Sequence, residues 1–205
     1  QYRELTADVD ELAGEGFGVR MIYWTLELME AFMRSPAPDT AAREKLMHSV
    51  LARLTPLRGR LSCLQRAAVH SLSTEFGWTF DLPPAKQDMS SDGLASHLRG
   101  KSIAIYSLVD GASRQAKAAL QALSDDIDVQ CSSDHGGTSQ LRALAINSDL
   151  FVIAWAAAKH ASTEFIRAHR SDRPIVYAEG KGVSSLLRAI EEYFAVRVDG
   201  LKQPR

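Results

Sequence analysis

The chain has 205 residues, of which 45% are hydrophobic and 24% are charged, and its formal net charge is -1. This size fits one large domain or two small ones, and the near-neutral charge excludes a global basic field that would draw the protein to nucleic acid or to a membrane. The longest apolar runs, 21–33 and 150–158, are too short or too charged to cross a bilayer, so we expect no membrane association.

Residues 1–80 have the pattern of a small helical bundle. Apolar side chains recur at helical spacing in three segments, over 18–35, 41–54 and 61–76. Pro36 and Pro56 separate these segments, and Asp39 is expected to cap the second helix. The first of these helices is apolar on more than one side, which is typical of a central helix or of an oligomer contact. We therefore expect a homo-oligomer or a subunit of a larger complex.

Residues 81–100 are predicted to be a linker. Pro83 and Pro84 stand next to a polar stretch over 86–92, and this composition favours an extended connection. A short helix over 91–98 is expected to end the linker.

Strand and helix patterns alternate after Gly100. Short apolar, β-branched runs predict four strands, over 102–109, 127–131, 150–156 and 174–178. Helical segments follow them, over 112–123, 138–147, 161–169 and 184–194. Four successive strand–helix units imply a parallel sheet with right-handed crossovers and helices on both faces, and the simplest strand order is 2-1-3-4. The sequence thus predicts an α/β chain whose parallel-sheet domain covers residues 101–205.

Polar residues gather directly after each predicted strand. Ligands of open parallel sheets bind beyond the carboxyl ends of the strands, so these positions are the candidate ligand-binding residues. They are Asp110, Asp134, His135, Gly136, Gly137, Lys159, His160, Gly180, Lys181, Gly182, Ser184 and Ser185.

The chemistry that this set favours is anion binding. Glycine-rich turns let backbone N–H groups approach a ligand, helix N-termini carry a partial positive charge, and Lys159 and Lys181 add point charges. The segment has no P-loop, and its first turn, 110–113, lacks the dinucleotide-binding glycine pattern. Glycine is also an ordinary turn residue and serine an ordinary helix cap, so local structural roles are the alternative for this set.

His135 and His160 are the most specific residues of the candidate site. Together with Asp134 they could form a metal site or an acid–base pair of a hydrolase. No third ligand stands at a diagnostic spacing, so we expect no metal, no cofactor and no catalytic residue, and binding is the favoured interpretation. Cys63 and Cys131 form no metal-binding spacing either, which favours a reduced, cytoplasmic protein.

A local basic run offers a further alternative in the helical half. Arg53, Arg58, Arg60 and Arg66 could contact phosphate backbones, as in a DNA-associated subunit. The ordinary interpretation is a solvated helix face, since no recognition motif accompanies these arginines.

The segment 101–193 resembles a bacterial Rossmann-like family that is classed as a domain of unknown function. The resemblance rests on the strand at 102–109, the turn at 134–137, the segment 148–150, Lys159-His160 and the turn at 180–185. In that family a His-Gly-Gly turn, an apolar strand after an Asp and a final Gly-Ser turn recur in this order. The resemblance implies a Rossmann-like fold and a shared site without an assigned activity, and the first turn departs from the Gly-Gly turn of the family.

These observations favour a bacterial sensing or interaction protein that is not an enzyme. Its Rossmann-like domain would bind a small anionic, nucleotide-like ligand or a protein partner, and its helical domain would transmit that state or mediate assembly. A regulatory or antiviral-defence system is the expected setting. The opening residue is Gln1 rather than Met, which is consistent with a fragment of a longer protein.

Overall fold

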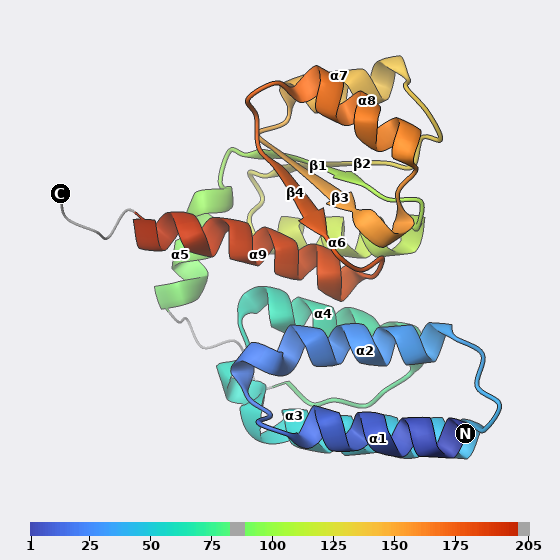
Figure 1. Ribbon diagram of the computed structural model, residues 1–205. Helices are drawn as coiled ribbons and strands as arrows, with labels where there is room; N and C mark the ends of the chain where they lie inside the picture. Colours follow the sequence, from blue (N-terminus) through green and yellow to red (C-terminus); the bar gives the residue numbers. More distant parts are fainter. Residues whose placement is uncertain (83–88, 201–205) are drawn as a thin grey trace. The chain divides into compact units, whose positions relative to one another are not determined.

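The computed structural model describes residues 1–82 and 89–200, and the chain divides into two compact units, 1–86 and 87–205 (Figure 1). Pro83, Pro84 and the first part of the predicted linker's polar stretch lie outside the described residues. The last part of that linker is helical, as expected, in α5 (Met89–Leu98). Nowhere along the described chain is a helix long and apolar enough to span a bilayer.

The second unit is built on a four-stranded parallel sheet. Its strands are β1 (Ser102–Tyr106), β2 (Asp128–Ser132), β3 (Leu150–Ala154) and β4 (Ile175–Ala178). They lie in the order β2-β1-β3-β4, which confirms the order predicted from the sequence. Every pairing is parallel, and the register sets Ile103 opposite both Val129 of β2 and Leu150 of β3.

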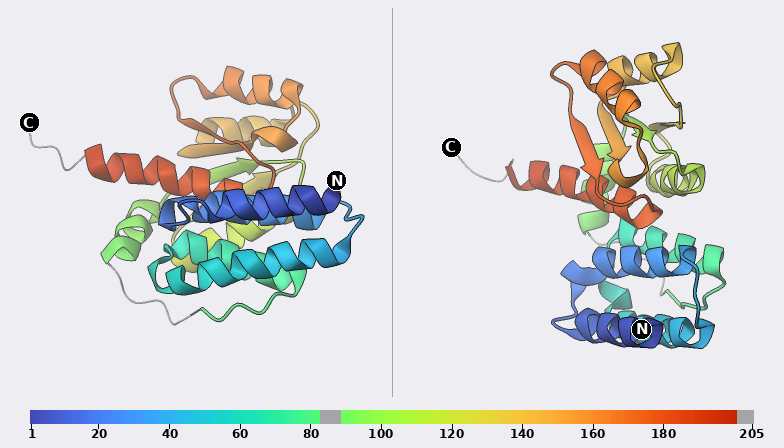
Figure 2. Two further views of the ribbon diagram at one scale, coloured as in Figure 1. Left: turned by 60° about the horizontal axis from the view of Figure 1, so that its bottom comes forward. Right: turned by 45° about the vertical axis from the view of Figure 1, so that its right-hand side comes forward.

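Helices cover both faces of the sheet. They are α6 (Asp110–Leu123), α7 (Ser139–Asn147), α8 (His160–Arg170) and α9 (Val183–Gly200). Helices α7 and α8 pack together on one face, and α6 and α9 pack together on the other (Figure 1, Figure 2). The helices that follow the neighbouring strands β1 and β3 therefore lie on opposite faces, and this defines the topological switch point of the sheet.

Strand alternation divides the core of this unit into two layers. Tyr106, Phe151 and Ile153 belong to the apolar cluster that includes α7 and α8. The intervening residues Ile103 and Ile105 are fully buried and point to the other face, because side chains alternate along a strand. Central strands that are buried on both faces explain the unbroken apolar runs of the sequence.

Two predicted strands end earlier in the structure than the sequence suggested. The first stops at Tyr106, and the third stops at Ala154, so Trp155 belongs to a short 3-10 helix, η3 (Trp155–Ala157). Helices α6, α8 and α9 also begin one or two residues earlier than predicted. Asp110 and His160 consequently lie in the first turns of helices and not in loops, while Ser184 lies in the first turn of α9, within the helix that was predicted.

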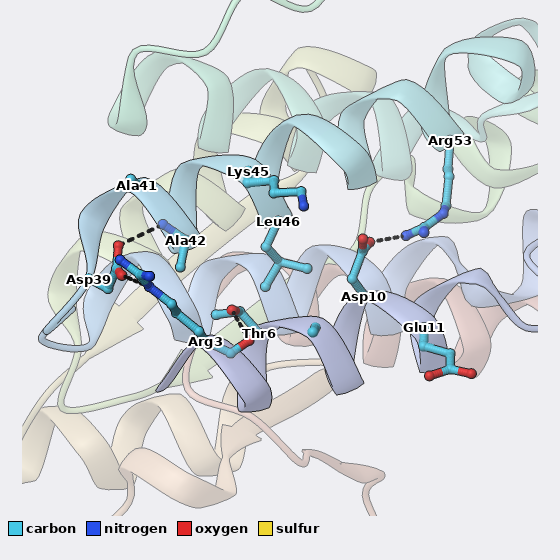
Figure 3. Close-up of a pocket in the computed structure, with 11 residues that line it drawn as sticks. Arg3, Thr6, Asp10, Glu11, Asp39, Ala41, Ala42, Lys45, Leu46 and Arg53 are labelled. Atoms are coloured by element: carbon cyan, nitrogen blue, oxygen red, sulfur yellow. Dashed lines mark hydrogen bonds and ion pairs between the residues drawn. The ribbon is translucent and has the colours of Figure 1, made fainter. Parts of the chain in front are cut away.

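The first unit is helical, as predicted. Its helices are α1 (Tyr2–Gly14), α2 (Ile22–Arg34), α3 (Thr40–Leu54) and α4 (Cys63–Phe76), with short 3-10 helices η1 (Val19–Met21) and η2 (Thr55–Arg60). Asp39 caps α3 as predicted, because its Oδ1 accepts a hydrogen bond of 3.0 Å from the backbone N–H of Ala42 (Figure 3). Ser62 and Gln65 form a reciprocal capping box at the start of α4.

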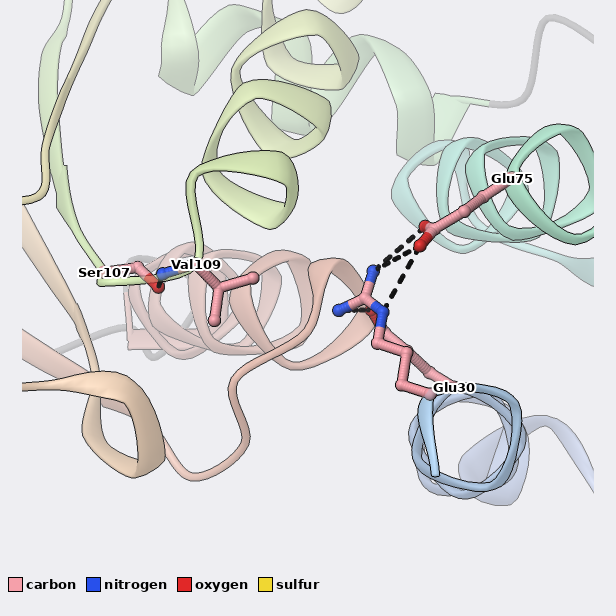
Figure 4. A network of polar contacts seen from close by, with 5 residues as sticks. Glu30, Glu75, Ser107 and Val109 are labelled. Carbon is pink, nitrogen blue, oxygen red and sulfur yellow. Dashed lines mark hydrogen bonds and ion pairs between the residues drawn. The ribbon is translucent and has the colours of Figure 1, made fainter. Parts of the chain in front are cut away.

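An ion-pair network links α2 to α4. Glu30 is only 3% exposed, and its carboxylate lies 2.9 Å from Nη1 of Arg34. Nη2 of the same guanidinium lies 2.9 Å from the carboxylate of Glu75 on α4 (Figure 4). A buried carboxylate is costly unless it is paired, so Arg34 satisfies Glu30 and fixes the two helices together.

Candidate functional site

The carboxyl ends of the strands are joined by backbone hydrogen bonds. The N–H of Ser107, directly after β1, donates to the carbonyl oxygen of Ser132 at the end of β2. The N–H of Leu108 donates over 2.8 Å to the carbonyl oxygen of Ala157, which follows β3. These bonds hold the loops after β1, β2 and β3 as one assembly at the switch point.

The loop between β2 and α7 is anchored through Asp134. Its carbonyl oxygen accepts hydrogen bonds from the hydroxyl of Tyr106, at 2.9 Å, and from the hydroxyl of Ser162, at 3.0 Å. Both donors are fully buried, one in β1 and one in the first turn of α8. The loop that carries His135 is therefore fixed against the start of the helix that carries His160.

The carboxylate of Asp134 is engaged locally. Its Oδ2 accepts a hydrogen bond from the hydroxyl of Thr138, which in turn caps α7 by accepting a bond of 3.0 Å from the N–H of Leu141. This arrangement makes Asp134 part of the α7 cap. It was predicted as a ligand-binding residue, and the structure places its carboxylate in a structural role within the same loop.

Four basic or titratable side chains of the predicted set are exposed at this edge. They are His135, Lys159, His160 and Lys181. None of these side chains makes a hydrogen bond or an ion pair with the part of the chain that is described. They are therefore available to a ligand, and the two lysine charges and the imidazole N–H donors suit an anion.

The glycines and serines of the predicted set have local roles. A Cβ atom at Gly137 would overlap the ring of Phe165, so close packing requires glycine there. The hydroxyl of Ser185 accepts a bond of 2.8 Å from the N–H of Gly180 and closes the turn before α9. Ser184 is fully buried, and its hydroxyl has no partner among the described residues.

Three further members of the predicted set add little to the geometry of this edge. The carboxylate of Asp110, in the first turn of α6, lies 3.9 Å from the guanidinium of Arg114 as an exposed pair. No atom lies within 4 Å of a Cβ built on Gly136, so its loop position is open. Gly182 is buried directly before α9.

The geometry does not favour a metal centre. No three His, Cys, Asp or Glu side chains within 1–82 and 89–200 stand close enough together to hold one ion. Cys131 is also unsuited to nucleophilic chemistry, because burial raises the pKa of its thiol and its Sγ lies 3.5 Å from the carbonyl oxygen of Ser113.

An exposed aromatic pair at this edge did not emerge from the sequence. Trp155 and Tyr177 are 56% and 41% exposed, and their rings meet edge to face with centroids 5.7 Å apart. The sequence predicts Trp155 as part of a buried strand because it lies within an unbroken apolar run, 150–158. The sequence does not show that β4 pairs with β3 only as far as Ala154, and so it does not show where β3 ends.

A cavity with a volume of about 500 Å³ lies between α1 and α3 of the helical unit (Figure 3). Ion pairs occupy both of its ends, Arg3 with Asp39 and Arg53 with Asp10, the latter at 2.6 Å. Arg53 belongs to the basic run that could have contacted DNA. Because the guanidinium of Arg53 is paired with the carboxylate of Asp10, it is not free to contact a phosphate backbone.

Comparison with known proteins gives one result. A family model described as DpdD-like matches residues 1–189, and no curated protein and no solved structure matches the chain. The match covers the helical unit as well as the parallel-sheet unit, whereas the resemblance found in the sequence was limited to the C-terminal half. The chain therefore belongs to the DpdD-like family.

Proposed function

We propose that the carboxyl edge of the parallel sheet binds a small anionic ligand of nucleotide-like chemistry, and that this binding is a sensing step in a bacterial defence system. Membership of the DpdD-like family is compatible with a defence-related role. The ligand class is our inference from the residues at the edge of the sheet.

The observation that carries the proposal is the contrast between fixed loops and free side chains. The backbone of the β2–α7 loop is held by two buried hydroxyls, while the side chains of His135 in this loop and of His160 at the start of α8 have no described partner. A preorganised backbone with free donors is the arrangement that binds a ligand without a large ordering cost. Lys159 and Lys181 supply the positive charge at the same end of the sheet.

A hydrolase that uses Asp134, His135 and His160 is less well supported. The carboxylate of Asp134 accepts the Thr138 hydroxyl in the cap of α7, so it would have to leave that cap to act as a ligand or a base. A DNA-associated role is less well supported as well, because Arg53 is paired with Asp10.

The test is a thermal-unfolding screen of the whole chain against inorganic pyrophosphate, ATP and GTP. A ligand at 100 times its Kd stabilises the folded state by about 2.7 kcal/mol, which raises Tm by about 5–10 °C for a chain of this size. We expect the double variant Lys159→Ala/Lys181→Ala to weaken binding about tenfold or more, and added salt to weaken binding further.

Lys101→Ala is the matched control. Lys101 is also an exposed lysine of the same unit, but it precedes β1 and so lies at the amino edge of the sheet. Equal losses in the double variant and the control would place the anion elsewhere. The absence of any shift with all three compounds would refute the proposed function.

A further inference from the structure

Trp155 and Tyr177 form an exposed aromatic pair at the carboxyl edge of the sheet. Both rings are large and apolar, and their exposure of 56% and 41% leaves apolar area in water that folding does not remove. The edge-to-face contact at 5.7 Å, with the ring planes 82° apart, holds the two rings in a defined geometry. The indole is therefore oriented in advance of any ligand.

Strand register explains why these two residues meet. Ile153 of β3 stands opposite Tyr177 of β4, and Ala154 stands opposite Ala178, the last residue of β4. Trp155 follows β3 in η3, and its ring contacts the ring of Tyr177, so the indole lies beside the side of the sheet that Ile153 and Tyr177 share. That side is the one that α8 covers, since Ile153 packs in one cluster with Ile166 of α8.

A lysine and a histidine stand at the start of α8, at the same end of the sheet. The helix α8 begins with Lys159 at its N-cap and His160 in its first turn, four and five residues after Trp155. Neither side chain has a described partner. A planar aromatic surface beside a free lysine ammonium and a free imidazole matches the two halves of a nucleotide, whose base stacks on aromatic rings while its phosphates attract positive charge and N–H donors.

We propose that Trp155, oriented by Tyr177, is a stacking surface for the base of a nucleotide whose phosphates are bound by Lys159 and His160. This inference rests on the proposed function and narrows it, because it selects a base-bearing ligand over a simple phosphate compound. Trp155 and Tyr177 then determine specificity, and Lys159 and His160 supply affinity that any polyphosphate shares.

The test compares base-bearing and base-free ligands on the whole chain. ATP, GTP and inorganic tripolyphosphate are titrated by calorimetry, and tryptophan fluorescence is recorded in parallel. Stacking on an aromatic side chain changes binding roughly 5- to 100-fold on removal of the ring. We expect Trp155→Ala to weaken ATP or GTP by that factor and to leave the affinity for tripolyphosphate unchanged, and Trp155→Phe to restore most of the loss.

Two controls separate stacking from unfolding. Trp24→Ala removes another exposed tryptophan, in the helical unit, and should leave every affinity unchanged. Tyr177→Ala should weaken nucleotide binding less than Trp155→Ala does, since its ring only orients the indole. Circular dichroism spectra that match the unaltered chain establish that each variant is folded.

The outcomes are distinct. Equal weakening of nucleotides and tripolyphosphate in Trp155→Ala would show that the ring supports the loops rather than stacking on a base, and would overturn the inference. Unchanged nucleotide affinity in a folded Trp155→Ala would overturn it as well, while the proposed anion site would stand. If neither the nucleotides nor tripolyphosphate bind the unaltered chain, the proposed function itself fails.

Discussion

Arg170 offers the sharpest test of how the parallel-sheet unit is held together. Its side chain is only 1% exposed at the end of α8, yet it carries a charge. Nη1 donates to the carbonyl oxygens of Ala145 and Ser148, at 2.9 and 3.1 Å, and to the Ser148 hydroxyl at 2.9 Å. Nε donates over 2.8 Å to the carbonyl oxygen of Pro174, which precedes β4. One guanidinium thus caps the C-terminus of α7 and fixes the entry to β4.

The expected change in the free energy of unfolding of Arg170→Met is the loss of hydrogen bonds less the cost of burying the guanidinium charge, which the variant avoids. Three N–H groups, two on Nη1 and one on Nε, serve these four acceptors and contribute about 6 kcal/mol at about 2 kcal/mol each, while Nη2 is buried without a partner among the described residues. Burial lowers the pKa of Arg170 from its ordinary value to about 10, with the nearby Arg173 adding to the effect. That shift corresponds to a cost of about 3 kcal/mol for holding the charge, which the methionine variant recovers. The free energy of unfolding should therefore fall by about 3 kcal/mol.

Arg170→Lys separates geometry from charge. A lysine ammonium keeps the charge but lacks the planar fork that reaches all four acceptors, so it retains the burial cost and loses bonds. We expect it to be at least as destabilised as Arg170→Met in urea denaturation followed by circular dichroism. Arg167→Met is the control, because Arg167 on the same helix makes only an exposed ion pair with Glu164 and should cost less than about 0.5 kcal/mol. Full stability of Arg170→Lys, or a loss in Arg170→Met no larger than in the control, would refute the reasoning.

Three further predictions concern single positions. Gly137→Ala should lower the free energy of unfolding by about 1–3 kcal/mol, because its Cβ overlaps the Phe165 ring, whereas Gly136→Ala, with open space around it, should be near neutral in the same urea denaturation. Cys131 should react with iodoacetamide at neutral pH more than about tenfold more slowly in the folded chain than in urea, because burial raises the pKa of its thiol; equal rates by mass spectrometry would contradict this. Hydrogen bonds from the backbone N–H of Ala42 and from Arg3 lower the pKa of Asp39, so the ionised carboxylate stabilises the fold fully above about pH 4. This stabilisation is lost as the pH falls through the pKa of Asp39 in the folded state. The difference in Tm between the unaltered chain and Asp39→Ala should therefore shrink in acid, and a constant difference would contradict the prediction.

The architecture could be predicted because its signals are local and repeated. Strands buried on both faces read as unbroken apolar runs, and amphipathic helices separate them at regular intervals, so four strand–helix units leave few topologies. The order 2-1-3-4 followed from short connections and right-handed crossovers. Prolines and the Asp39 cap marked the helix boundaries of the first unit for the same local reason.

The ends of elements were less predictable because they depend on the neighbouring strand. Trp155 continues an apolar run, but β4 pairs only as far as Ala178, opposite Ala154. Beyond that pair the chain turns into η3 and the indole becomes exposed. Arg170 shows the reverse effect. A charged residue in the last turn of a helix is expected at the surface, and only the tertiary structure brings the end of α7 and Pro174 to its guanidinium.

The polar residues at the carboxyl edge of the sheet fall into two groups with different structural roles. Short polar residues such as Asp134, Thr138 and Ser185 form hydrogen bonds within the loops and helix caps. Long side chains, among them Lys159 and Lys181, remain free because no acceptor of the described chain reaches them. Substitutions of the first group should therefore lower stability, and ligand affinity only through it, whereas substitutions of the second group should lower affinity at constant stability. A sequence that lists both groups as one polar cluster cannot separate these effects, but paired measurements of unfolding and binding on the same variants can.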